Sequence, residues 1–183
     1  MKKKLVLSVL LTVCILTVGV GSMIAYFSSI SGPVENTFTV GQVELSLTET
    51  TGGSYQMVPG ATVEKDPVVT VERGSEECYV YVKLEWRGGL ENYALYELAD
   101  GWINLGGIDG VYYRHVDATP INMNYHVLRD DRMVISSELT EEILATIAPD
   151  TCQLVVTAYA IQTLGMDSPA DGWYNLMNAL EEG

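Results

Sequence analysis

Positive charge is scarce in this chain once its first four residues are set aside. The 183 residues include 24 acidic side chains but only ten basic ones, and Lys2, Lys3 and Lys4 account for three of the ten. Beyond that basic head, seven basic residues face 24 acidic ones, which gives the rest of the chain a formal charge of −17. Such a surface repels nucleic acid and anionic lipid headgroups, so neither is expected as a partner.

Histidine is also scarce, and the usual catalytic motifs are missing. Neither His115 nor His126 belongs to a His-Glu-x-x-His motif or has a ligand at helical spacing, and no Gly-x-Ser-x-Gly occurs. Gly106 and Gly107 have no lysine beside them that would bind phosphate. We therefore predict no catalytic residue, no cofactor and no metal, and do not expect an enzyme. A metal shared by the two histidines and acidic loop residues is the alternative.

Only three cysteines are present, and Cys14 lies in the apolar segment near the start. Cys78 and Cys152 each open an apolar, strand-like segment. An even pair in an exported chain permits one disulfide. The alternative is two separate buried thiols that behave as small hydrophobic side chains.

The first segment is typical of a secretory signal. Three lysines precede an apolar run over residues 5–20, and small residues follow it. The run is shorter than the roughly 20 apolar residues that span a bilayer, which favours a removable signal over a permanent anchor. Cleavage is predicted beside Ala25, Tyr26 and Phe27, with an uncleaved anchor as the alternative. Residues 1–26 are then the signal peptide, which touches the membrane only during export, and residues 27–183 form one secreted domain.

The rest of the chain has the pattern of a mainly β protein. Alternating, β-branched and aromatic segments predict strands at residues 43–47, 62–72, 78–86, 102–105, 111–116, 122–128, 133–136 and 152–162. Pro67 confines the first part of its strand to a sheet edge or a bulge. Residues 88–100 are ambiguous, because Leu90, Ala94 and Leu98 also fit a short helix. We expect an antiparallel β-sandwich of the jelly-roll or immunoglobulin-like kind.

Two short peripheral helices complete this prediction. Residues 138–147 have an apolar face and are followed by Pro149. Near the end, Ser168 is a candidate N-cap, Pro169 takes the first helical position and Asp171 the capping-box position. Trp173 and the apolar residues after it form one stripe, which we expect to pack on the domain.

Several motifs resemble the camelysin/TasA family of secreted proteins, whose export depends on a SipW-type signal peptidase. They are Ala25-Tyr-Phe-Ser28, Asn36-Thr-Phe-Thr-Val-Gly41, Val58-Pro-Gly60, Lys65-Asp-Pro67, Glu77-Cys-Tyr-Val-Tyr-Val-Lys83 and Thr157-Ala-Tyr-Ala-Ile-Gln162 with Trp173. The resemblance covers most of the chain, while residues 88–130 match little.

The resemblance implies a sandwich exported to the cell surface or extracellular matrix of a Gram-positive bacterium. Family members form biofilm fibres by donating an N-terminal strand to the next subunit. Here the candidate donor is the segment 27–38, marked by Phe27, Val34 and Phe38. The implied partners are other copies of the chain or related matrix proteins, and the signal peptidase during export. The alternatives are a camelysin-like surface metallopeptidase and an accessory module that binds a polysaccharide or a pilin.

Overall fold

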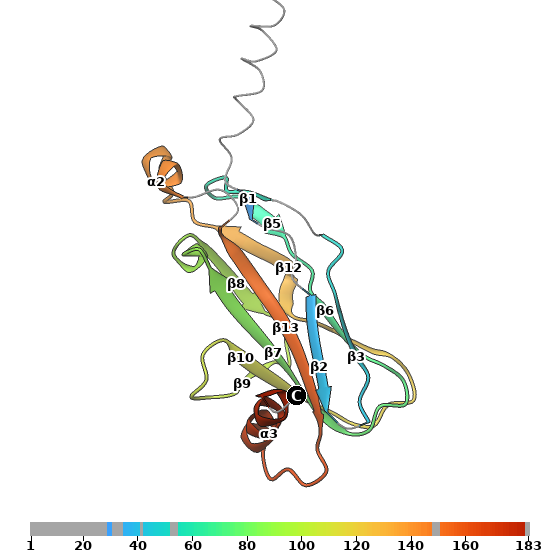
Figure 1. The fold of residues 1–183 in the computed structure, drawn as a ribbon. Coiled ribbons are helices and arrows are strands. Elements are labelled where there is room, and N and C mark those ends of the chain that lie inside the picture. The colour runs from blue at the N-terminus through green and yellow to red at the C-terminus, as the bar shows by residue number, and fades with distance from the viewer. Residues whose placement is uncertain (1–28, 31–34, 41, 52–54, 148–150, 182–183) are drawn as a thin grey trace, which may run out of the picture.

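The computed structural model describes residues 29–30, 35–40, 42–51, 55–147 and 151–181 (Figure 1). The strands are β1 (Ser29–Ile30), β2 (Glu35–Val40), β3 (Leu45–Thr48), β4 (Tyr55–Gln56), β5 (Thr62–Glu64), β6 (Val68–Val71), β7 (Cys78–Arg87), β8 (Ala94–Leu98), β9 (Ile103–Asn104), β10 (Val111–Val116), β11 (Met123–His126), β12 (Leu128–Ile135) and β13 (Gln153–Gln162). The helices are η2 (Leu90–Asn92), α2 (Glu141–Thr146) and α3 (Pro169–Glu181).

One layer of the fold is a five-stranded sheet in the order β2-β13-β7-β10-β9. Its centre is the antiparallel pair of β7 and β13, which runs from Arg87 opposite Gln153 to Cys78 opposite Gln162. Both strands are rich in β-branched and aromatic residues, which pack well on a pleated surface. The prediction of strands in these two segments is confirmed.

The other layer contains the sheets β11-β6-β3 and β5-β12-β8. They are joined through the chain, because β5 leads into β6 and β11 leads into β12. Pro67 lies at the first of these interruptions, where its carbonyl accepts from the Val127 N–H at 2.9 Å. On the facing strand, Asp130 and Asp131 take φ values of 54° and 51° and form a bulge. Strand β5, which ends before Pro67, is an edge strand of its sheet, as predicted, whereas the expected single strand over residues 62–72 is broken into β5 and β6.

The main core lies between the two layers and is mostly aliphatic. The five-stranded sheet contributes Val80, Val82, Leu84, Leu154, Val156 and Ala158, and the other layer contributes Leu47, Val63, Val69, Val71, Leu128, Met133 and Ile135. The fold is therefore the predicted mainly β sandwich. One departure from the antiparallel pattern is the pairing of β2 with β13, which is parallel.

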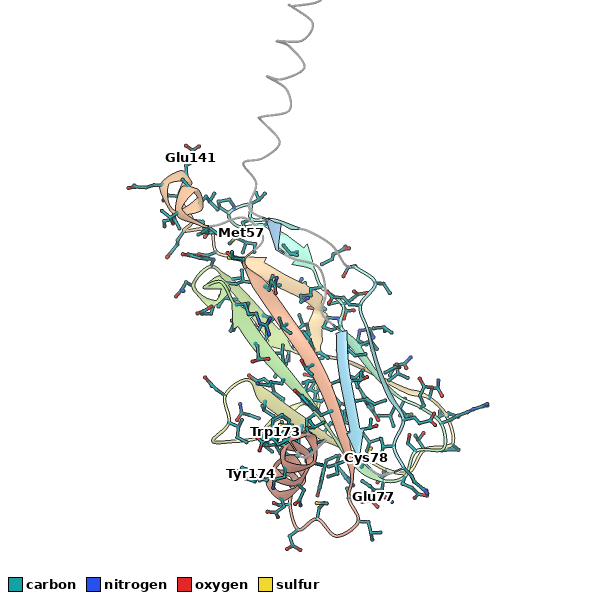
Figure 2. The ribbon with its side chains drawn as sticks, in the orientation of Figure 1. Met57, Glu77, Cys78, Glu141, Trp173 and Tyr174 are labelled. Atoms are coloured by element: carbon teal, nitrogen blue, oxygen red, sulfur yellow. The ribbon has the colours of Figure 1, made fainter. Side chains whose placement is uncertain are left out.

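The helices α2 and α3 lie at opposite ends of the molecule (Figure 1). The Oγ of Ser168 accepts from the Asp171 N–H at 3.2 Å and donates to the Asp171 carboxylate at 2.8 Å, so the predicted cap is formed. In α3, Trp173 is 5% exposed and packs on the sheet, while the next residue, Tyr174, is 60% exposed (Figure 2). The helical alternative for residues 88–100 is wrong, because a single turn of η2 is followed by strand β8.

The disulfide between Cys78 and Cys152 is also wrong. Both cysteines are free and buried. Cys78 is aligned with Gln162 at one end of the β7–β13 pair, whereas Cys152 immediately precedes Gln153 at the other. Ten residues of strand separate the two positions by about 30 Å, far beyond the reach of a disulfide. Burial, with a smaller contribution from Glu77, raises the pKa of the Cys78 thiol to about 12, so the alternative of inert buried thiols holds.

Candidate functional site: the N-terminal edge of the five-stranded sheet

Strand β2 forms one edge of the five-stranded sheet. It pairs in parallel with β13 over six residues, from Glu35 opposite Val156 to Val40 opposite Ile161. Among the described strands, β13 is its only neighbour in that sheet. Main-chain hydrogen bonds to β13 attach this edge strand, which also contacts β3 and α3, and such bonds do not depend on which copy of the chain supplies the strand.

The short strand β1 gives the N-terminal segment a second attachment. Ser29 pairs with Gln56 and Ile30 with Tyr55 of β4. Of the three residues proposed to mark the donor segment, Phe38 lies in β2, where its backbone is opposite Tyr159. Phe27 and Val34 lie outside the described residues, as do Lys2, Lys3, Lys4, Ala25 and Tyr26 of the predicted signal and cleavage region.

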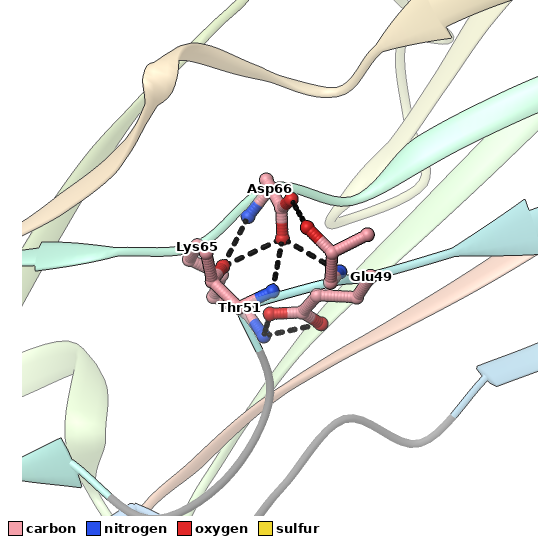
Figure 3. A network of polar contacts seen from close by, with 5 residues as sticks. Glu49, Thr51, Lys65 and Asp66 are labelled. Carbon is pink, nitrogen blue, oxygen red and sulfur yellow. Dashed lines mark hydrogen bonds and ion pairs between the residues drawn. The ribbon is translucent and has the colours of Figure 1, made fainter.

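A buried ion pair joins the segment after β3 to the turn between β5 and β6 (Figure 3). The Nζ of Lys65 donates to both carboxylate oxygens of Glu49, at 2.9 and 3.0 Å. The side chains of Lys65 and Glu49 are only 4% and 3% exposed. Two charges this well buried are tolerated because they are paired, and removing Glu49 would leave the Lys65 charge uncompensated.

The neighbouring Asp66 binds the segment that follows Glu49. Its carboxylate accepts from the backbone N–H groups of Thr50 and Thr51 at 2.9 and 2.8 Å and from both threonine hydroxyls. Burial alone would raise the pKa of Asp66, but these hydrogen bonds together lower it to about 2. Together the ion pair and Asp66 fasten the end of β3 to the turn between β5 and β6. We call Glu49, Thr50, Thr51, Lys65 and Asp66 the polar clasp.

Helix α3 covers part of the outer face of the five-stranded sheet. Its Trp173 and Leu176 pack with Tyr81, Tyr159 and Ile161 in a second buried cluster. The Tyr81 hydroxyl donates to the Pro169 carbonyl at 2.7 Å. Helix α3 contacts β13, β7 and β2, so it lies close to the edge strand itself. The predicted packing of the apolar stripe is confirmed.

The two histidines lie on different strands, and each contacts a carboxylate. His115 Nε2 is 2.8 Å from Glu77, and His126 Nδ1 is 2.8 Å from Asp131. No group of three or more His, Cys, Asp or Glu side chains that could hold a metal ion is found in the described part of the chain. The two histidines are therefore not brought together in one such group.

Sequence reasoning missed two features of this region. One is the parallel pairing of β2, because the partner of a strand is set by the topology of the whole chain. The other is the polar clasp, because a lysine is expected to be solvated. The adjacent threonines at 50 and 51 and the Lys65-Asp66-Pro67 turn are its only local signals.

Comparison of the chain with protein-family models, with curated proteins and with solved structures finds no match in any of the three. Among the helices that the structure describes, none is both long and apolar enough to cross a membrane.

Proposed function

We propose that this chain is an exported structural protein of the cell surface or extracellular matrix, of the TasA-like type, which assembles with other copies of itself by exchanging its N-terminal strand. A single observation carries the proposal: β2 is an edge strand attached in parallel to an otherwise antiparallel sheet. A strand that occupies this edge in its own domain can make the same contacts on the next copy. Exchange of an identical element costs little, because no new interface has to be created.

The direction of such an exchange favours a filament. Each copy gives its N-terminal segment to one neighbour and receives one at its β13 edge from another. A head-to-tail contact of this kind does not close unless the rotation between copies forms a ring. The acidic surface keeps the free copies apart in solution until strands are exchanged.

A reversible disulfide that fixes β2 to β13 of its own domain, here called the lock, tests the proposal. Thr37 is exposed and is paired with Ala158 of β13, so Thr37→Cys with Ala158→Cys places two cysteines on neighbouring strands within the range of a disulfide. The native Cys78 and Cys152 lie at opposite ends of the β7–β13 pair and cannot bridge each other, and mass spectrometry of the digested protein will confirm that the new bridge joins positions 37 and 158. We expect the oxidised mature variant to stay monomeric by light scattering and electron microscopy, and to assemble once reduced.

Two matched controls accompany the lock. Thr37→Cys alone reports the effect of substitution without a bridge, and the wild-type chain in the same oxidant reports the effect of the oxidant. Assembly of the locked variant at the wild-type rate would show that β2 is not exchanged. Sequencing the N-terminus of the exported protein separately tests the predicted cleavage beside Ala25, Tyr26 and Phe27.

A further inference from the structure

A cleft lies on the side of the sandwich away from β2, between β7, β8, β10 and the turn that precedes β10. Its volume is about 460 Å³, within the range of small-molecule sites. It lies partly in residues 88–130, the segment that the sequence motifs do not explain. The cleft takes no part in strand exchange, so the inference below does not rest on the proposed function.

Aromatic rings from three strands line this cleft. Trp86 of β7 and Tyr96 of β8 stack with their ring centroids 5.0 Å apart and their planes 31° apart. The hydroxyls of Tyr96 and Tyr112 share a hydrogen bond, and burial raises the pKa of Tyr96 above its usual value. All three rings are half-buried, so each keeps some surface for a ligand. Because the three rings contact one another, they need little rearrangement to bind a ligand.

The charges around these rings are mostly negative. Glu85, Glu91 and Asp109 line the cleft together with one cation, Lys83. Lys83 contacts the Glu85 carboxylate at 3.1 Å, which leaves Glu91 and Asp109 as the excess negative charge. The strongly acidic chain adds to this local potential, so the cleft attracts cations and repels phosphates and carboxylates.

Two glycine turns shape the walls of the cleft. Gly110 has a φ of 70°, and a Cβ there would lie 2.4 Å from the Leu84 carbonyl oxygen. The Leu84 N–H donates to the Gly110 carbonyl at 2.9 Å, which holds the Asp109 turn against β7. Gly88, with a φ of 65°, would place a Cβ 2.2 Å from the Thr151 carbonyl oxygen. It begins the turn that carries Glu91. Both carboxylates are therefore set on turns that other residues cannot form.

We propose that this cleft binds an amino sugar through its protonated amine. The apolar C–H face of a pyranose ring packs on the aromatic wall, and the ammonium group lies between Glu91, Asp109 and the ring faces. An ammonium is attracted by both carboxylates and aromatic quadrupoles. A neutral sugar gains no charge interaction with the exposed carboxylates of Glu91 and Asp109. A wall made of rings from three strands is broader than the stem of a lysine and suits the C–H face of a pyranose.

Titration of the mature wild-type protein with a β-1,4-linked glucosamine tetrasaccharide tests this proposal, followed by calorimetry and by NMR. The probe carries the amine on the ring. Its N-acetylated counterpart has the same ring without the charge, and cadaverine has the charge without the ring. We expect saturable binding of the glucosamine probe, weaker at high salt, and binding at least about tenfold weaker for both comparison compounds.

Paired variants locate the binding. Glu91→Gln with Asp109→Asn removes both free charges and keeps the shape of the side chains, and we expect about a tenfold loss of affinity. Glu64→Gln, an exposed change on β5 of the other layer, serves as the matched control and should bind as wild type. Trp86→Leu should abolish binding, and thermal unfolding will show that the variant is folded.

Three results would overturn the proposal. The first is no saturable binding of the glucosamine probe to the wild-type protein. The second is equal binding of a comparison compound. Equal binding of the acetylated probe would show that the amine is not recognised, and equal binding of cadaverine would show that the sugar ring is not recognised. The third is unchanged affinity in the Glu91→Gln and Asp109→Asn double variant, which would place the binding elsewhere.

Discussion

The β2 edge of the five-stranded sheet and the region around β10, across the sheet, make different kinds of contact. We call them the β2 side and the β10 side. On the β2 side, a strand lies along β13 through main-chain hydrogen bonds, and its exposed Thr37 and Thr39 add no charge. On the β10 side, three aromatic rings and several carboxylates surround a cleft shaped by glycine turns. Main-chain pairing accepts any strand of suitable register, whereas a cleft of fixed side chains selects by chemistry. One side therefore suits repeated attachment of identical copies, and the other suits recognition of a small group.

Removing residues 27–40 should have the largest effect, because it should abolish assembly while leaving ligand binding in the cleft intact. Without β2, we expect the chain to lose assembly altogether while its affinity for the glucosamine probe stays within about twofold of wild type, because the cleft lies across the sheet. Electron microscopy and calorimetry on the same preparation measure both. Adding a peptide of residues 27–40 should refill the β13 edge. Loss of probe binding together with assembly would show that the two sides are not independent.

Breaking the polar clasp should have the next largest effect. Glu49→Gln leaves Lys65 charged and buried, and we expect a loss of about 3–5 kcal/mol in the free energy of unfolding by urea. The double variant Glu49→Leu with Lys65→Met removes both charges and should lose much less. If the single and double variants are equally destabilised, the contribution lies in packing rather than in charge. The cleft should bind its probe normally in the double variant.

Asp66 should make the free energy of unfolding depend on pH in the acidic range. Its pKa is near 3.8 in the unfolded chain and about 2 in the folded one, so the folded state favours the ionised carboxylate. That stabilisation is complete above about pH 4 and is lost as the pH falls towards about 2. We expect Asp66→Asn to cost about 1–2 kcal/mol at neutral pH and nearly nothing at pH 2. Urea unfolding of both proteins across this range will check it, and a pH-independent difference would contradict it.

Loosening the cap of α3 should have the smallest effect. Ser168→Ala removes the oxygen that accepts from the Asp171 N–H, and we expect a loss of about 1 kcal/mol. Because α3 lies near β2 and away from the cleft, hydrogen exchange should rise in α3 and β2 but not around Tyr96. Thr140→Ala at the cap of α2, on the far end of the molecule, is the matched control. Equal exchange in β2 for both variants would mean that α3 does not support the edge strand.

Features that depend on neighbouring residues were the most predictable from sequence. Strands β7 and β13, the edge position of the strand before Pro67 and the cap at Ser168 each follow from local patterns. Residues 90–98 were ambiguous, because apolar residues spaced by four also fit the alternating burial of β8. The partner of β2, the burial of Lys65 and the gathering of three aromatic rings depend on distant segments. No local pattern specifies which distant segments will meet.

The parallel pairing of β2 also has a mechanical consequence. In a filament made by strand exchange, the body of one copy pulls on β2 through the residues that follow Val40, while the next copy holds β13. Because the pair is parallel, that pull enters it at the end where Val40 lies opposite Ile161. The hydrogen bonds nearest Ile161 therefore carry the load first, and the pair yields from that end towards Glu35.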